Sequence, residues 1–396
     1  MILEVHILQN FAPSNLNRDD TGAPKDCEFG GYRRARISSQ CLKRAMRETM
    51  RASALLPPED LARRTKRLVE EVGRRLVAAG RDEQEARAVI IAALAAAGLK
   101  VEANQKTQYL LFLGEREIAN LVALCAEHWD ALLAVGQAAD EGAKGGGRAA
   151  KKAKPVAGSP AIGDALKRLL DGGRAADLAL FGRMIADLPD RNVDGACQVA
   201  HALSTNSVSV EFDFYTAVDD LQTDDTTGAD MLGTIEFNSA CYYRYANVDV
   251  ARLEANLQGD SELTRRTVEA FLRAAITAVP SGKQNSMAAQ NPPSLVCVVA
   301  RRTGLWSLAN AFVQPVRAGG AGDLVAQSMV RLDAHWGRLT RMYGADQITG
   351  AWVCSLDDTP LPNLTPAGSN TKTVGVESVD RLVAGALGAL SSGVAA

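Results

Sequence analysis

The sequence lacks the apolar runs and cysteine patterns that mark membrane, secreted and zinc-binding proteins. No hydrophobic stretch approaches the roughly 20 residues of a membrane-spanning helix, and the opening MILEVHILQNFAPS has no basic start or cleavage site. The seven cysteines are odd in number and contain no CxxC pair, which indicates neither a disulfide framework nor a zinc site. These absences predict a cytoplasmic protein with reduced cysteines and no membrane partner.

The motifs of nucleotide hydrolysis and metal catalysis are missing as well. No GxxxxGK(S/T) loop occurs, and the four histidines are isolated from one another and from carboxylates at ligand spacing. We therefore predict no catalytic residue, no metal and no cofactor. Asp19 and Asp20 could hold Mg²⁺ or act as a base. Arg18 and Lys25 beside them favour ion pairs and hydrogen bonds that order the loop.

Positive charge is concentrated in one part of a nearly neutral chain. The formal net charge of the 396 residues is −2, which excludes a uniformly basic coat and leaves a patch or groove as the way to bind nucleic acid. Between residues 33 and 51, seven basic residues stand against one acidic residue, Glu48. This stretch predicts a phosphate-rich partner, with a solvated charged face as the alternative.

A helix with a cationic side is predicted within this stretch. Ser38 or Ser39 can cap its N-terminus by accepting a hydrogen bond from a backbone N–H. Lys43, Arg47 and Arg51 recur at i, i+4 and i+8 along one side of the helix. The free N–H groups and the dipole at its start also attract anions. Such contacts can hold a sugar-phosphate chain without reading its sequence.

The remaining pattern indicates an α+β protein with a helical insertion. Residues 2–8 are typical of a first strand, and residues 59–140 have the composition and spacing of helices. A basic, Gly-rich loop follows at 140–160. Strand and helix patterns then alternate from about residue 208 to about residue 302, and an apolar stretch near 383–390 could be a short helix. The helical region therefore interrupts a compact α+β unit.

Three other segments are candidates for binding. The basic loop fits transient contact with a duplex backbone, or it is a solvated insertion. Val210, Phe212 and Phe214 alternate with polar residues and could wedge against bases or pack in a core. In the segment FGRM, Arg183 could grip a phosphate while Met184 contacts a base.

Several longer motifs resemble one known family. They are SNLNRDD, KDCEFGGYRRARISSQCLKRAMR, FGRM, VDGACQVAHALSTN, DFYTAVDDL, LGTIEFNSACYYRYANVD, GKQNSMAAQNP and SLANAF. In this order, over most of residues 1 to 315, the chain is similar to the CasC family, the backbone subunits of the type I-E CRISPR Cascade surveillance complex. The similarity fades in the helical region, in the basic loop and after Arg317.

The resemblance implies an RNA-recognition-motif-like (ferredoxin-like) palm, an inserted helical fingers domain and a β-hairpin-like thumb. Members of the family polymerise head to tail along a CRISPR RNA, and each thumb displaces a nucleotide at regular intervals. The implied boundaries are 1–59 for the first part of the palm, 60–180 for the fingers with the basic loop at 140–160, 181–194 for the return to the palm, 195–230 for the thumb, and 231–396 for the second part of the palm and a C-terminal segment.

The implied function is a non-catalytic RNA-binding subunit in antiviral defence, which presents the guide for target DNA pairing and R-loop formation. The implied partners are the CRISPR RNA, target DNA, further copies of the chain in a filament, the large, small, 5′-handle-capping and hairpin-processing subunits of Cascade and, indirectly, the helicase-nuclease. A complex that must accept any spacer is expected to contact phosphates and riboses and leave base edges free.

Residue roles follow from the cationic patch, the FGRM pair and the family motifs together. The predicted RNA contacts are Arg18, Arg34, Ser38, Ser39, Gln40, Lys43, Arg47, Arg183 and Met184. The predicted thumb contacts, to the displaced nucleotide and the neighbouring subunit, are His201, Leu203, Val210 and Phe212. The predicted target-DNA contacts in the basic loop are Lys144, Lys151, Lys152 and Lys154.

Two other functions stay open at this point. With Asp19, Asp20 or Asp26 as a metal ligand or base, the chain would be a metal-dependent ribonuclease, similar to the type III backbone subunits that cut target RNA. Without a guide RNA, it would be a generic single-strand-binding or scaffold protein. Incubation with complementary RNA and Mg²⁺ tests the first alternative, and the sequences of copurifying RNA test the second.

Overall fold

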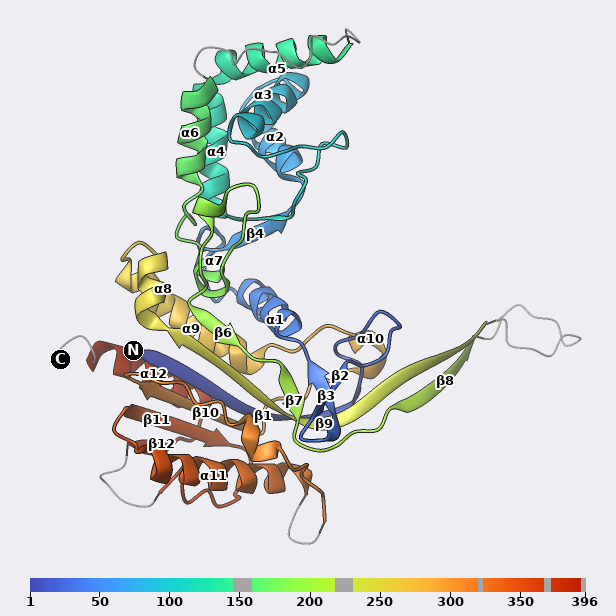
Figure 1. The fold of residues 1–396 in the computed structure, drawn as a ribbon, viewed down its shortest axis with the longest axis vertical. Helices are drawn as coiled ribbons and strands as arrows, with labels where there is room; N and C mark the ends of the chain where they lie inside the picture. Colours follow the sequence, from blue (N-terminus) through green and yellow to red (C-terminus); the bar gives the residue numbers. More distant parts are fainter. Residues whose placement is uncertain (145–158, 218–230, 320–322, 367–371, 393–396) are drawn as a thin grey trace, which may run out of the picture. The chain divides into compact units, whose positions relative to one another are not determined.

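Two compact units make up the chain in the computed structural model, which describes residues 1–144, 159–217, 231–319, 323–366 and 372–392 (Figure 1). Unit 1 consists of Met1–Leu55, Cys197–Val250 and Val268–Ala396, and unit 2 consists of Leu56–Ala196 and Ala251–Thr267. The chain leaves unit 1 after its first strands and helix, forms most of unit 2, returns to unit 1 at Cys197, and adds a second, shorter segment to unit 2 at Ala251–Thr267. The predicted α+β class is confirmed, with a helical segment between parts of a mixed unit.

Unit 1 is built on one large sheet. The strand order is β12-β11-β10-β1-β9-β7-β3-β2, and β6 and β8 also pair with β9. The described pairs are antiparallel, except that β11 and β12 are parallel. The strands are β1 (Ile2–Ser14), β2 (Asp26–Phe29), β3 (Tyr32–Ile37), β6 (Cys197–Val199), β7 (Ala202–Ser204), β8 (Glu211–Ala217), β9 (Met231–Asp249), β10 (Leu295–Arg301), β11 (Ile348–Ser355) and β12 (Thr373–Gly375).

The first strand is longer than its predicted range of residues 2–8. It continues to Ser14 because the residues after Leu8 keep pairing with β9, as Phe11 does with Ala240. Phe11 also packs edge-on against Tyr242, with ring centroids 5.8 Å apart. The polar residues between these contacts hide the strand's second half from a simple hydrophobicity pattern.

Helices cover both faces of this sheet. On one face, Val5 of β1 lines a small cavity together with Met46 of α1 and Ala275 of α9. On the other face, the His6 ring lies 6.5 Å from the Trp336 ring of α11. The short helix predicted near 383–390 is part of α12. The helical elements of unit 1 are α1 (Ser39–Ala52), the second half of α9 (Ser261–Thr277), α10 (Gln284–Met287), η4 (Ala309–Phe312), α11 (Leu324–Tyr343) and α12 (Val379–Ser392).

A buried ion pair ties the loop after β10 to the sheet. The Glu4 carboxylate accepts hydrogen bonds from the Tyr245 hydroxyl at 2.7 Å and the Trp306 amide at 2.6 Å. Arg301 donates to it at 3.3 Å and stacks on the Trp306 ring, 3.8 Å from the centroid. Burial raises the pKa of Glu4, and the hydrogen bonds and Arg301 oppose that rise. The charged form of Glu4 therefore depends on this set of partners.

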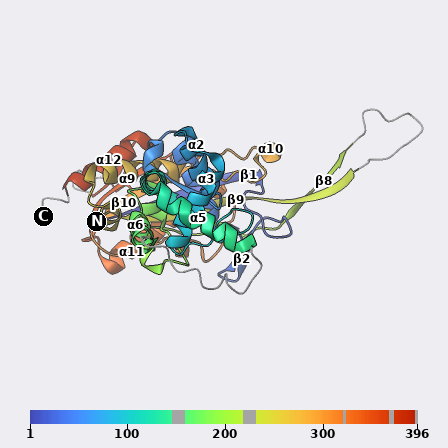
Figure 2. The same cartoon turned by 90° about the horizontal axis from the view of Figure 1, so that it is seen from above.

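A two-stranded ribbon runs outward from the sheet (Figures 1 and 2). The first part of β9 pairs with β8, from Ala217↔Met231 to Glu211↔Phe237, and the second part pairs with β1 inside the sheet. All residues of β8 are exposed. Gly233 leaves room for the Tyr215 ring, because a β-carbon there would lie 2.3 Å from that side chain.

Unit 2 is a helical bundle with a small two-stranded sheet. Val72, Ile90 and Ile118 are fully buried in its core. Among the described helices, none by itself is long and apolar enough to cross a membrane, and Glu115–Glu127 with Trp129–Ala138 passes that test only as a pair bent by 82°. The elements are η1 (Pro58–Asp60), β4 (Ala62–Thr65), α2 (Leu68–Ala78), α3 (Glu83–Ala96), β5 (Leu111–Gly114), α4 (Glu115–Glu127), α5 (Trp129–Lys144), α6 (Ser159–Leu169), α7 (Ala176–Phe181), η3 (Pro189–Arg191), most of α8 (Val250–Asn256) and the start of α9.

We predict that Arg301→Met lowers the free energy of unfolding by about 3 to 5 kcal/mol, because it leaves the Glu4 charge buried and unpaired. A carboxyl whose folded pKa is raised binds more protons in the folded state than in the unfolded state. The variant should therefore regain part of the lost free energy of unfolding as the pH falls from 7 to 5. Urea unfolding at both pH values measures this. The double variant Glu4→Gln/Arg301→Met should recover stability at pH 7, and a double variant as unstable as the single one would contradict the account.

Candidate nucleic-acid interface

The loop between β1 and β2 is held by its own polar side chains. The Asp19 carboxylate accepts hydrogen bonds from the Thr21 amide at 2.9 Å, the Thr21 hydroxyl at 2.7 Å and the Ala23 amide at 3.0 Å. The bond from the Thr21 hydroxyl is the main cause that lowers the pKa of Asp19. Asn15 donates to the Gly22 carbonyl at 2.9 Å. Asp19 thus orders the loop, as the sequence predicts, and the neighbouring Arg18 is exposed.

The same loop fixes the start of α1. The side-chain oxygen of Asn17 accepts a hydrogen bond of 2.8 Å from the Ser38 amide. Ser38 is the N-cap, and its hydroxyl accepts from the Cys41 amide at 3.3 Å. Of the two predicted caps the structure selects Ser38, because Ser39 is already helical. Ser38 is buried, whereas Gln40 is exposed at the open end of the helix.

The cations of α1 differ in their surroundings. Arg47 belongs to the buried face of the helix and is 8% exposed. Lys43 is half-buried, and Arg51 is exposed. Arg44, which the predicted stripe leaves out, is exposed and pairs with Glu48 at 2.7 Å. The stripe is therefore less open to a ligand than its spacing predicts.

Arg18 and α1 border a polar depression of about 560 Å³. Gly282 allows one wall to approach closely, because a β-carbon there would lie 2.4 Å from the Leu16 carbonyl oxygen. Lys43 and Arg47 are not among the lining residues, so the predicted RNA contacts fall on two sides of α1. The lining residues are Leu16, Asn17, Arg18, Asp19, Asp20, Thr21, Gly22, Cys41, Arg44, Ala45, Glu48, Pro280, Ser281 and Gly282.

Arg36 of β3 lies beside His201, which precedes β7, and the sequence does not predict this contact. One guanidinium nitrogen of Arg36 is 2.8 Å from Nδ1 of His201, and the neutral imidazole accepts this bond. Burial lowers the pKa of His201, and the charges of Arg36 and Lys25 lower it further. Because Arg36 and His201 are 165 positions apart, no local pattern could have brought them together.

Arg34 has a structural role and is not a surface cation. Its side chain is fully buried and donates to the carbonyl oxygens of Ser204 and Thr205, both at 2.9 Å, and of Phe312 at 2.7 Å. It thereby joins β3 to two segments far along the chain. The predicted RNA contact of Arg34 is corrected, since its guanidinium does not reach the surface.

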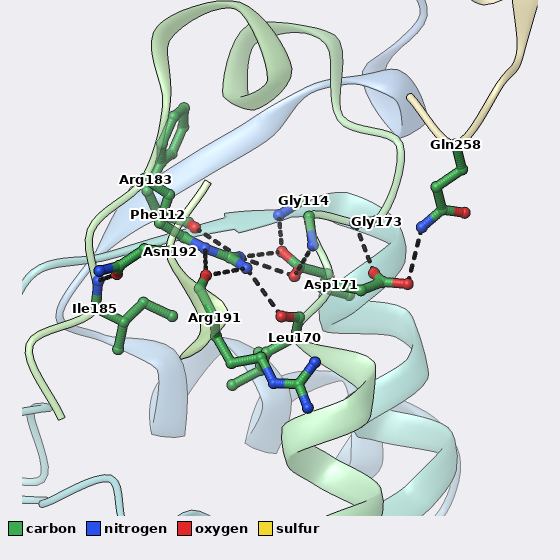
Figure 3. A network of polar contacts seen from close by, with 12 residues as sticks. Phe112, Gly114, Leu170, Asp171, Gly173, Arg183, Ile185, Arg191, Asn192 and Gln258 are labelled. Atoms are coloured by element: carbon green, nitrogen blue, oxygen red, sulfur yellow. Dashed lines mark hydrogen bonds and ion pairs between the residues drawn. The ribbon is translucent and has the colours of Figure 1, made fainter. Parts of the chain in front are cut away.

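The two predicted RNA contacts of the FGRM segment in unit 2 differ in exposure. Arg183 is buried, and Met184 is 79% exposed. Figure 3 shows the polar network around Arg183. Its guanidinium donates to both carboxylate oxygens of Glu117, at 2.8 and 2.9 Å, and to the Leu170 carbonyl at 3.0 Å. The predicted phosphate contact of Arg183 is therefore corrected as well, since these protein groups occupy the guanidinium. Met184 remains available at the surface.

The network also sets how Met184 is presented. Arg183 exchanges two backbone hydrogen bonds of 2.8 Å with Val193. Gly182 has φ +79°, and a β-carbon there would lie 2.8 Å from the Gly195 nitrogen, so the turn requires glycine. With the turn and the neighbouring side chain both fixed, Met184 has to project outward.

The four thumb candidates lie in two different places. Leu203 lies within the sheet, in β7, where it pairs with Arg36 of β3, and His201 directly precedes that strand. Val210 precedes β8, and Phe212 lies in the ribbon with 67% of its surface exposed. The predicted division into an apolar and a polar face does not appear in the burial of β8, because both of its sides are exposed.

The predicted target-DNA contacts belong to the basic loop at 140–160. Lys151, Lys152 and Lys154 lie outside the described residues. Lys144 is described only as the last backbone position of α5. Their contact with target DNA stays a prediction.

We predict that Arg183→Gln lowers the free energy of unfolding by about 3 to 5 kcal/mol, because it leaves the buried Glu117 charge without its partner. The adjacent Met184→Ala is the matched control and should change stability by less than about 0.5 kcal/mol, since that side chain is exposed. Denaturant unfolding of both variants measures the difference. Equal stability of the two variants would contradict a buried, structural Arg183.

Two solved structures are similar to this chain over its whole length. One, described as "CRISPR RNA-guided surveillance complex, pre-nicking", is 32% identical with a TM-score of 0.81, and the match covers 98% of this chain and 100% of that chain. Another, described as "CRISPR RNA-guided surveillance complex", is 27% identical with a TM-score of 0.71 and the same coverage. They confirm the predicted resemblance to the backbone subunits of Cascade-type surveillance complexes.

The family match extends through nearly all of the chain. No curated protein matches the chain. Residues 3–383 match the family described as CT1975-like protein, including the region after Arg317 where the quoted motifs give no similarity. The chain therefore belongs to the CT1975-like protein family.

Proposed function

We propose that the chain is a non-catalytic CRISPR RNA-binding backbone subunit of a cytoplasmic type I-E Cascade, which polymerises head to tail along the guide RNA. The observation that carries the proposal is the full-length similarity to chains of RNA-guided surveillance complexes. In this role the chain presents the guide for target DNA pairing and R-loop formation. Its partners are further copies of itself and the other Cascade subunits.

The strand order supports an RNA-recognition-motif-like palm in unit 1. In chain order the central elements are β1, α1, β7, β9, α9 and β10. In the sheet they run β10-β1-β9-β7, so the first strand lies between the last and the third. This order is that of a βαββαβ ferredoxin-like unit. Unit 1 is accordingly the proposed palm, and unit 2 is the proposed fingers domain.

The guide is proposed to bind along the 16–22 loop and the open end of α1. RNA-recognition motifs stack bases on aromatic side chains of the sheet. Here Tyr243 and Tyr245 of β9 are buried, and the Tyr243 hydroxyl accepts a hydrogen bond of 2.8 Å from the Leu308 amide. These aromatics pack in the core beneath η4 and α11. A phosphate-directed contact at α1 therefore replaces stacking on the sheet in this proposal.

The β8–β9 ribbon is the proposed thumb. A two-stranded ribbon on its own is marginally stable in water, and Phe212 and Phe214 expose 67% and 64% of their surface. A neighbouring subunit or a displaced base would cover these rings. A head-to-tail contact that does not close gives a filament, as the proposed polymer along the RNA requires.

The environment of the acidic residues supports a non-catalytic role. Asp19 is engaged by three hydrogen bonds within its own loop. Asp26 is paired with Arg33 across the β2–β3 hairpin. Both carboxylates thus have structural partners, which favours loop ordering over metal-dependent cleavage.

We predict that Lys43→Ala and Arg18→Ala each weaken RNA binding to a similar extent for different spacers. Each should reduce the slope of log affinity against log salt by about 0.7, the value for one phosphate contact on a single strand. Filter binding over a range of salt concentrations measures the slope. Arg87→Ala, which removes a cation paired with Glu83 in unit 2, is the control and should leave the slope unchanged. Unchanged slopes for Lys43→Ala and Arg18→Ala would show that these cations do not contact phosphates.

We also predict that the assembled complex does not cut complementary RNA in the presence of Mg²⁺. Gel analysis of labelled target RNA measures this, with Asp19→Ala and Asp26→Ala complexes alongside. Cleavage at regular spacing that disappears in either variant would refute the non-catalytic assignment and identify a ribonuclease.

A further inference from the structure

α11 carries a stripe of basic and apolar side chains to which the proposed function gives no role. Arg331, His335, Arg338 and Met342 recur at i, i+4, i+7 and i+11, which places them in one stripe along the helix. Arg331, Arg338 and the nearby Arg341 are exposed. The opposite side of α11 packs in the core through Met329, Leu332 and Trp336.

These arginines are not neutralised by neighbouring acids. Within the residues that the structure describes, no carboxylate lies within ion-pair distance of Arg331, Arg338 or Arg341. The acidic residue of α11 itself, Asp333, is buried and accepts a hydrogen bond of 2.9 Å from the Asn363 amide. On α1, α3 and α9, by contrast, an arginine is paired with a glutamate four residues away. Arg331 donates to the Gln314 carbonyl at 2.9 Å, and Arg338 lies 3.4 Å from Nδ1 of His335, so these partners leave the positive charge of the arginines uncompensated.

The helix dipole explains only part of this arrangement. A cation in the last turn stabilises the C-terminal end of a helix, and Arg341 occupies that turn. The effect falls off within one turn, whereas Arg331 lies about three turns before the end. Arg331 has a structural partner in the Gln314 carbonyl, to which it donates at 2.9 Å. The dipole does not account for Arg338, which lies before the last turn.

Exposed apolar and aromatic side chains lie at the same end of α11. Met342 and Tyr343 expose 76% and 65% of their surface, and Leu305 exposes 43%. The Tyr343 ring contacts Trp306, with centroids 6.2 Å apart, and Trp306 is held by the Arg301 guanidinium. An aromatic ring in a fixed place beside arginines is the combination that binds single strands, because the cations follow the phosphates and the bases stack on the ring.

Two further cations border this end of the helix. Arg302 is exposed, and its amide donates to the Gln347 carbonyl at 2.9 Å. The Lys372 ammonium lies 3.4 Å from the Ala345 carbonyl oxygen. Asp346 is the acidic residue of the same turn, so the cations remain in excess.

We propose that the exposed side of α11, together with the 302–306 loop, is a second nucleic-acid site that binds a single strand through phosphates and base faces. It lies on the opposite face of the sheet from α1, where the guide RNA is proposed to bind. A single strand offers base faces that can stack on the Tyr343 ring. A duplex hides its base faces and an acidic protein segment has none, so the ring favours a single strand as the ligand. Guanidinium groups and rings do not read the ribose 2′-hydroxyl, and single-stranded DNA and RNA should bind alike.

Fluorescence anisotropy with labelled oligothymidylate and oligouridylate tests this site on the purified protein with its copurifying RNA. Arg338→Ala/Arg341→Ala should lower the salt slope of oligonucleotide binding by about 1.4, for two phosphate contacts. Tyr343→Ala should weaken binding at least about fivefold, whereas Tyr343→Phe keeps the ring and should bind normally. Arg381→Ala removes an exposed cation from α12, across the sheet, and should also bind normally. Thermal unfolding confirms that each variant is folded.

Oligonucleotide binding that is equal in the double variant and the unmodified protein would overturn the proposal. Loss of copurifying RNA in the double variant would also overturn it, because α11 would then belong to the guide site. A third outcome would assign the surface to an acidic protein instead. In that case the unmodified protein would bind a polyglutamate peptide, and the double variant would lose peptide binding but keep oligonucleotide binding. If the purified protein carries no RNA at all, the guide-RNA proposal fails, and the anisotropy series still decides the role of α11.

Discussion

The pairing of β1 with β9 is the contact on which the rest of the structure depends. Its register runs from Ile2↔Asp249 to Phe11↔Ala240 and joins the start of the chain to a strand beyond the first and longer segment of unit 2, Leu56–Ala196. The entropy of closing a loop grows slowly with its length, by about 0.6 kcal/mol for each doubling, so a large insertion between the two strands is tolerated. The ladder also anchors the exposed ribbon, because β9 continues from the sheet into its pairing with β8.

Features that depend on neighbouring residues could be predicted from the sequence. The cap at Ser38, the first strand, the helical insertion and the helix near residue 383 each follow from local patterns of polar, apolar and glycine residues. Arg34 and Arg183 could not be placed in this way. Both lie in basic or polar segments, and their partners are backbone carbonyls and a glutamate that only the tertiary fold brings close. A guanidinium that holds a fold together looks the same in a sequence as one that binds RNA.

The covering of the sheet was also outside the reach of local patterns. The tyrosines of β9 alternate as they would on an open RNA-binding sheet, but η4 and α11 bury them. This burial turns the sheet into a scaffold and moves the possible nucleic-acid contacts to its margins. There the loop at 16–22, the start of α1, the Arg36–His201 contact and the outer side of α11 present polar and cationic groups.

A protein organised in this way holds a polyanion through charge and leaves the sequence of the bound strand unread, which is what a guide-RNA backbone subunit needs. The most direct test of this account is the sequence of the RNA that copurifies with the chain from cells that carry its CRISPR array. The account predicts repeat-derived RNAs of uniform length, with spacers of many different sequences. Purification without RNA, or with a random sample of cellular RNA, would contradict it.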